Sequence, residues 1–305
     1  MRDPEAVRIR IVVTAAVVAS LLTATGCAEN EPETAVTLAP LAVEPAAPPT
    51  TIAPGPGPPD GPTTTTVPAV VEGLDELDDL DDLAGFDAVA VDTEVIIGRS
   101  VEDRPITVVR RGHAGGTKVL VVGVIHGDED AGADIVDVLR LADVPDGVEL
   151  WLVRSMNPDG QAAQERHNAH GVDLNRNFAH NWGPVAEPGN WEYAGEGPAS
   201  EPETRAMTAL GEGVHPDLVL WYHQDLFRIS PASGRDGEIR ARYAALTGLP
   251  LVQVTGGTYT GTASQWSRTV VETGGVGFTI ELGPSLTRDE VITHAEAVLT
   301  IASEM

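Results

Sequence analysis

The sequence predicts an α/β fold: a mixed, mostly parallel central sheet with helices on both faces, preceded by a disordered tether. Between residues 88 and 305, short β-branched runs alternate with amphipathic segments, which is typical of an α/β domain. Several of the runs are apolar throughout, as expected of strands buried on both faces. The preceding segment, 27–87, is rich in Pro, Thr and acidic residues and shows no apolar periodicity that could build a core.

Residues 1–26 are typical of a lipoprotein signal peptide. Three arginines lie within the first ten residues, and the apolar run 9–22 is short for a membrane-spanning helix. The run leads into LLTATGC, which resembles a bacterial lipobox that ends at Cys27. Cys27 is the only cysteine, so no disulfide framework exists within the chain. We therefore expect an exported chain, lipid-anchored through Cys27 to the outer face of the cell membrane; an ordinary signal with an incidental cysteine is the alternative.

The charge balance restricts the partners of this chain. Segment 27–87 holds 13 acidic residues and no lysine or arginine, so we expect it to be a solvated tether with a short helix at most. Residues 88–305 hold 16 basic and 31 acidic residues, a net charge of −15. So acidic a domain does not suit nucleic acid, which is bound by basic surfaces. We expect a monomer without a nucleic-acid partner.

The first half of the folded part predicts a hairpin followed by a strand–helix–strand unit. EVIIG (94–98) and PITVVRR (105–111) are expected to pair as the hairpin. The continuous apolar run KVLVVGVI (118–125) predicts a buried strand. GADIVDVLRLA (132–142) has apolar residues at helical spacing, and VELWLV (148–153) predicts the next buried strand.

The second half continues the alternation of helices and strands. The segment 200–213 predicts a helix with Ser200 as N-cap and Glu203 three residues later, the pattern of a capping box. The remaining predicted elements are strands at 217–223, 249–254 and 275–282 and helices at 237–248 and 287–302.

Unusual polar residues collect at the carboxyl ends of four predicted strands. His126 and Glu129 follow one strand, and the motif NPDG (157–160) follows the next. His223 ends a third strand, and Glu281 lies at the end of a fourth. In open α/β sheets, ligands bind at this edge, so the sequence predicts an active site there.

The residue types at this edge suit a metal ion. His126 and Glu129 are three residues apart, so one loop could direct both toward the same ion. Catalytic zinc commonly takes two His and one Glu, and His223 is the best second histidine because it leaves a buried strand. Alone, HxxE is a weak motif and His223 could be a core histidine. No HExxH occurs, which excludes a helix-borne site of that kind. The other six histidines are expected at the surface: His113, His167, His170, His180, His215 and His294.

Five motifs together resemble the carboxypeptidase A-like zinc peptidases: HGDE, NPDG, GVDLNRNF, WYHQ and FTIEL, in that order. The resemblance covers residues 92–303 and is similar in style to the short bacterial members, which include the murein peptide amidases. It implies a zinc carboxypeptidase-like fold and one zinc ion per chain, held by His126, Glu129 and His223. It also implies that Glu281 deprotonates the catalytic water and later protonates the leaving amine.

The resemblance implies roles for five further residues. Asn175 and Arg176 would hold the terminal carboxylate of the substrate, which suits the planar fork of an arginine. Asp173 would accept a hydrogen bond from a zinc-bound histidine and fix its tautomer. Arg166 would stabilise the oxyanion. Tyr259 matches a mobile tyrosine of the family, although a packing tyrosine is the alternative.

The chain departs from the digestive members of the family at two places. Gln224 follows the third ligand where they have serine, and the residues just before Trp266 carry no charge that would select a substrate side chain. Arg268 is nearby and could contact a second carboxylate.

The function that the resemblance implies is that of a zinc metallopeptidase, a carboxypeptidase or amidase. Its substrate would be a peptide, derived from peptidoglycan, in which the amide bond next to a free carboxylate is cleaved. One alternative is a zinc deacylase of small N-acyl amino acids. Another is a catalytically silent domain that binds wall peptides.

Overall fold

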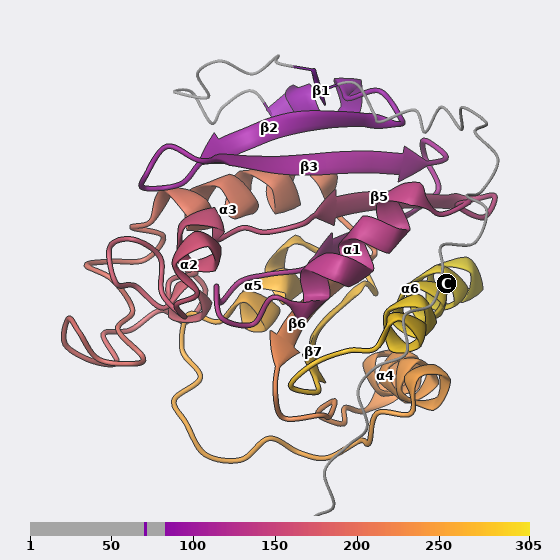
Figure 1. Ribbon diagram of the computed structural model, residues 1–305. Helices are drawn as coiled ribbons and strands as arrows, with labels where there is room; N and C mark the ends of the chain where they lie inside the picture. Colours follow the sequence, from indigo (N-terminus) through magenta and orange to yellow (C-terminus); the bar gives the residue numbers. More distant parts are fainter. Residues whose placement is uncertain (1–69, 72–82) are drawn as a thin grey trace, which may run out of the picture. The chain divides into compact units, whose positions relative to one another are not determined.

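A mixed sheet of seven strands runs through the computed structural model, which describes residues 70–71 and 83–305 (Figure 1). The strand order is β1-β2-β3-β5-β4-β6-β7. β3 pairs antiparallel with both β2 and β5, whereas β5, β4, β6 and β7 are parallel neighbours. The predicted hairpin and the mostly parallel sheet are therefore confirmed. The strands are β1 (Val70–Val71), β2 (Thr93–Arg99), β3 (Pro105–Gly112), β4 (Thr117–Val122), β5 (Val148–Val153), β6 (Leu218–Gln224) and β7 (Val276–Leu282).

Helices cover both faces of the sheet, as predicted. α1, α4 and α6 pack on one face, and α3, α5 and the 3-10 helix η1 pack on the other (Figure 1). The helices are η1 (Leu83–Ala88), α1 (Ala131–Leu141), α2 (Pro158–Ala163), η2 (Leu174–Arg176), α3 (Pro202–Val214), α4 (Gly234–Thr247), α5 (Ala263–Val270) and α6 (Arg288–Glu304).

The central strands are buried on both faces, which explains their uninterrupted apolar sequences. Every residue of β5 is buried, and so are the first six residues of β6. Side chains alternate across a strand, so each strand contributes to two cores. Leu220 belongs to the core beneath α1, α4 and α6, whereas Trp221 belongs to the core beneath α3 and α5. Full burial of one such side chain stabilises the fold by about 1.5–3 kcal/mol.

Two predicted local features are wrong. The segment 249–254 is no strand: Leu251 forms only an isolated bridge with Ile229, and the side chains of Leu251 and Val252 are 41% and 45% exposed. Pro250 has no N–H to give to a ladder. α3 begins one residue later than predicted, at Pro202, and has no capping box. A capping box does start α6, between Thr287 and Glu290.

The folded part begins before residue 88, where the sequence placed the end of the tether. η1 carries Phe86, whose side chain is 4% exposed and lies edge-on to Trp151 with ring centroids 6.4 Å apart. β1 also falls within the predicted tether. The signal peptide and Cys27 lie outside the described residues. Within the described ranges, no helix has the length and apolarity needed to cross a membrane.

His294 was predicted at the surface but is buried in α6, with 4% of its area exposed. Its Nδ1 lies 2.8 Å from the hydroxyl of Tyr243, which is 2.8 Å from the hydroxyl of Tyr222. Burial lowers the pKa of His294 to about 4, although the charge of Glu290 opposes this. The histidine therefore serves the core as a neutral hydrogen-bonding group.

We expect His294 to make the fold sensitive to acid. Because its folded pKa of about 4 lies below the ordinary value of 6.5, the unfolded chain takes up the proton first. The contribution of His294 to the free energy of unfolding is fully present above pH 6.5. It decreases as the pH falls toward 4, by about 3 kcal/mol at most. Urea unfolding across this range should show a shallower pH dependence for His294→Asn than for the wild type. The exposed control His113→Asn should follow the wild type, and parallel curves for all three proteins would contradict this role.

Candidate metal centre

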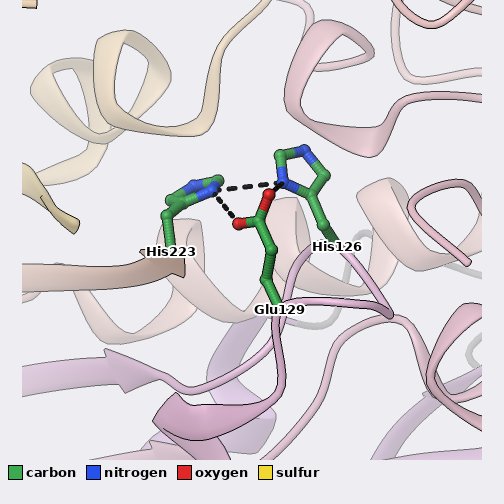
Figure 2. Close-up of side chains that lie close together, drawn as sticks. All are labelled: His126, Glu129 and His223. Carbon is green, nitrogen blue, oxygen red and sulfur yellow. Dashed lines mark hydrogen bonds and ion pairs between the residues drawn. The ribbon is translucent and has the colours of Figure 1, made fainter. Parts of the chain in front are cut away.

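Two histidines and one glutamate converge at the carboxyl edge of the sheet (Figure 2). His126 and Glu129 lie in the loop after β4, and His223 is the penultimate residue of β6. The carboxylate of Glu129 is 2.8 Å from Nδ1 of His126 and 2.9 Å from Nδ1 of His223. The two Nδ1 atoms are 3.2 Å apart. The structure thus brings together all three residues that were predicted as ligands.

A close contact between two loops shapes the histidine loop. A Cβ on Gly127 would lie 1.9 Å from the backbone carbonyl carbon of Gly160, so only glycine fits there. The side chain of Asn157 stabilises the same contact. Its amide nitrogen donates a hydrogen bond to the carbonyl of Ile125 over 3.1 Å, and its Oδ1 accepts one from the N–H of Gly160 over 3.0 Å. The motif NPDG therefore holds the ligand loop in place and contributes no ligand itself.

Asp173 lies behind His126 and is completely buried. It accepts hydrogen bonds from Nε2 of His126 over 3.0 Å and from Nη2 of Arg166 over 2.7 Å. Burial alone would raise the pKa of Asp173, but the charges and hydrogen bonds of His126 and Arg166 hold it well below its usual range. An ionised carboxylate can only accept, so His126 carries its proton on Nε2. Nδ1, which faces Glu129 and His223, is therefore the ring nitrogen left to bind a cation.

This donor set fits zinc. Two imidazole nitrogens and one carboxylate are the protein ligands of many catalytic zinc sites, which leave a fourth position open. Burial alone would raise the pKa of Glu129, but the two histidines lower it, so the carboxylate is ionised and can bind a cation. Burial would likewise lower the pKa of His126, but Asp173 and Glu129 raise it above its ordinary value. Such a concentration of carboxylate around two imidazoles favours a divalent cation. Asp128 and Asp130, in the same loop as Glu129, are exposed.

Glu281 lies beside the ligands on the neighbouring strand. His223 of β6 and Glu281 of β7 are directly paired in the sheet, so their side chains emerge on the same face. Burial raises the pKa of Glu281; the charge of His223 opposes this rise and that of Glu129 adds to it. Within the described part of the chain, no group donates a hydrogen bond to this carboxylate. It can therefore accept a proton from a molecule bound in the site.

The residues predicted to hold a substrate carboxylate line the same cavity as the three metal ligands. η2 carries Asn175 and Arg176, and the Asn175 amide nitrogen lies 3.4 Å from Nε2 of His223. Nη2 of Arg176 donates to the carboxylate of Glu192 over 2.6 Å. Tyr259 lies in the loop before α5, with its ring centroid 5.8 Å from the Arg176 guanidinium and 47% of its area exposed.

Arg166 lies against the ligands themselves. Its Nη1 is 3.0 Å from Nδ1 of His126 and 3.3 Å from Oε1 of Glu129. Its guanidinium also lies over the ring of Trp191, 4.5 Å from the ring centroid. Trp191 and Glu192 were not predicted, because they belong to a long segment without regular structure whose sequence carries no periodic signal.

Gln224, which follows the third ligand, ties the ligand strand to a helix. Its side-chain oxygen accepts a hydrogen bond from the N–H of Ala131, at the start of α1, over 2.8 Å. Its own N–H donates to the carboxylate of Glu129 over 3.1 Å. The ligand set and several of its neighbours surround a cavity of about 600 Å³. Site residues on its wall include His126, Glu129, Arg166, Asn175, Arg176, His223, Tyr259 and Glu281.

Comparison with known proteins agrees with this site. The sequence profile of the zinc carboxypeptidases matches residues 90–224. Murein peptide amidase A of Escherichia coli K12 is 31% identical over 180 residues, which cover 55% of this chain and 74% of the relative. The catalytic chain of human carboxypeptidase N is 30% identical over 191 residues, covering 48% of this chain and 38% of the relative.

Solved structures share the fold. The murein-tripeptide amidase of Escherichia coli O157 superposes with a TM-score of 0.56 at 24% identity, covering 71% of this chain and 94% of that one. Carboxypeptidase A of Helicoverpa armigera gives a TM-score of 0.60 at 19% identity, covering 74% of this chain and 70% of that one. The fold and the resemblance expected from the motifs are confirmed: the chain belongs to the zinc carboxypeptidase family and is a zinc metallopeptidase.

Proposed function

We propose that this metallopeptidase acts as a carboxypeptidase or amidase on peptides derived from peptidoglycan. It would hydrolyse the amide bond next to a free carboxylate. The observation that carries the proposal is one cavity that contains the His–Glu–His donor set, Glu281 and Arg176. The relatives named murein peptide amidase and murein-tripeptide amidase support wall peptides as the substrate class.

The chemistry follows from the groups that line the cavity. Zinc, when bound by His126, Glu129 and His223, supplies a Lewis acid that polarises the scissile carbonyl and lowers the pKa of water toward about 7. Glu281 takes the proton of the attacking water and passes it to the leaving amine. Its raised pKa, caused first by burial, suits a group that must both accept and donate a proton.

The positively charged groups orient the substrate. Arg176 and Asn175 hold the terminal carboxylate, which fixes the position of the scissile amide relative to Glu281. Arg166 lies against the ligand set and donates to the oxygen on which negative charge develops. Asp173 acts indirectly, because it orients both His126 and Arg166.

The Glu281→Gln variant tests this mechanism. Gln cannot take a proton from water, so kcat should fall about a thousandfold while the zinc content stays at one ion per chain. Mass spectrometry after incubation with wall tripeptides, ordinary peptides and N-acyl amino acids would report both turnover and substrate class. The exposed control Glu272→Gln should retain full activity. Undiminished turnover in Glu281→Gln would refute the mechanism, and preferential cleavage of N-acyl amino acids would favour the deacylase.

The ion pair between Arg176 and Glu192 predicts competition with the substrate. A substrate carboxylate can reach Nη2 of Arg176 only by displacing that of Glu192, which is 2.6 Å away. Removing the charge in Glu192→Gln should lower KM roughly fivefold and leave kcat nearly unchanged. Glu196→Gln, an exposed substitution in the same segment, should leave KM unaltered in steady-state assays. A higher KM for Glu192→Gln would instead assign Glu192 to substrate binding.

We further propose that the chain is exported and held at the outer face of the cell membrane by a lipid on Cys27, with the Pro- and Thr-rich segment that follows as the tether. The lipobox-like ending of the signal peptide supports this location. The Cys27→Ser variant should move from the membrane fraction to the soluble fraction of the producing cells. The wild-type protein should carry the mass of a lipid at its processed N-terminus, and a membrane-bound Cys27→Ser chain would contradict the proposal.

A further inference from the structure

The groups of the site come from separate segments of the chain, whose relative positions must be fixed. His126 and Glu129 lie in the loop that leads into α1, whereas His223 and Glu281 lie near the ends of β6 and β7. A proton can pass from water to a carboxylate only within a narrow range of distances, so the general base must be held accurately relative to the metal ligands. A contact that joins the ligand loop to the end of β7 supplies this constraint.

The side chain of Gln224 makes such a contact. Gln224 is the last residue of β6 and lines the cavity. Its Oε1 accepts a hydrogen bond from the N–H of Ala131, at the start of α1, over 2.8 Å. Its Nε2 donates to the carbonyl oxygens of Gly283, over 3.3 Å, and Pro284, over 3.1 Å, which follow β7 directly. One amide therefore joins the ligand loop to the segment that leaves β7.

The end of β7 is held on both of its edges by the same stretch of chain. On one edge, Gln224 pairs with Leu282 in the ladder between β6 and β7. The chain then crosses the end of β7. On the other edge, Arg228 exchanges two main-chain hydrogen bonds with Glu281, which are 2.9 and 3.0 Å long. Gln224 lies where this crossing begins, so its side chain stabilises the strand of the general base where the regular ladder stops.

The link requires both a donor and an acceptor at the end of one side chain. The amide of Gln224 supplies one of each, whereas an ionised carboxylate of the same length can only accept and a thioether donates nothing. The main-chain N–H of Gln224 donates separately to Glu129, over 3.1 Å. Replacing the side chain therefore keeps this contact to the metal ligand and removes only the link between the ligand loop and β7.

We infer that Gln224 is a positioning residue, whose side chain holds Glu281 at a fixed distance from the metal ligands. The inference rests on the proposed function, in which Glu281 is the general base. Without the link, the end of β7 is looser and the carboxylate of Glu281 spends less time within reach of the attacking water. The loss then falls on the rate of the chemical step. Binding of the substrate carboxylate is unaffected, because Arg176 lies on η2, outside this link.

Gln224→Met tests this role, because methionine is similar in length but forms neither hydrogen bond. In the zinc-loaded full chain, kcat for the best-cleaved peptide should fall about tenfold, while KM stays within about twofold and the zinc content is unchanged. In the Glu281→Gln background, the same substitution should lower kcat no further, because the group through which Gln224 acts is already lost. The exposed control Gln164→Met should keep the wild-type kcat.

Three kinetic results would overturn the inference. The first is an unchanged kcat in Gln224→Met, and the second is an equal fall of kcat in the wild-type and Glu281→Gln backgrounds. The third is a change in KM larger than that in kcat, which would assign Gln224 to substrate binding.

Hydrogen exchange in the same chains separates this inference from the proposed function. Peptic fragments that span 126–133 and 280–287 should both exchange faster in Gln224→Met than in the wild type. In Gln224→Glu, which keeps the acceptor and loses the donor, only 280–287 should exchange faster. If the wild type cleaves no peptide, the proposed function fails, yet this pattern would still support the link between the ligand loop and β7. Unchanged exchange in both fragments of Gln224→Met would overturn it.

Discussion

The hydrogen bond between Asp173 and His126 is the interaction on which the whole site depends. Burying a carboxylate without partners would cost several kcal/mol, so Asp173 can lie at 0% exposure only because donors surround it. Those donors are Nε2 of His126, the guanidinium of Arg166 and the N–H of Asn175, at the start of η2. The buried charge of Asp173 therefore fixes the tautomer of His126 and orients the guanidinium of Arg166. It also stabilises the start of η2, which carries the carboxylate-binding residues.

The parallel sheet supplies the second constraint, because it delivers each group to the same edge. β6 and β7 are in register, so His223 and Glu281 emerge side by side without any contribution from loops. The ligand loop after β4 has no such regular support. It is positioned by the approach of Gly127 to Gly160, which any larger side chain would prevent. The site thus combines rigid strand positions for one ligand and the general base with one loop whose path is fixed by a backbone contact.

The sequence predicted the elements whose physics is local or periodic. β4, β5 and β6 were recognisable because full burial requires continuous apolar runs, and the ligands were recognisable because they ended those runs. The sequence did not predict the features that depend on packing between residues far apart in the chain. His294 looks like a surface residue of an amphipathic helix, yet it completes a hydrogen bond to Tyr243. The partnership of Glu192 with Arg176 spans 16 residues of irregular chain, and no spacing rule connects the two.

The internal ion pairs of the cavity explain how it can bind carboxylates without leaving cations bare. A buried guanidinium without a counter-ion is costly, so Glu192 occupies Arg176 in the free protein. Binding of a substrate carboxylate exchanges one ion pair for another, and the net gain in free energy at Arg176 is small. Arg176 therefore serves mainly to set the orientation that the reaction needs.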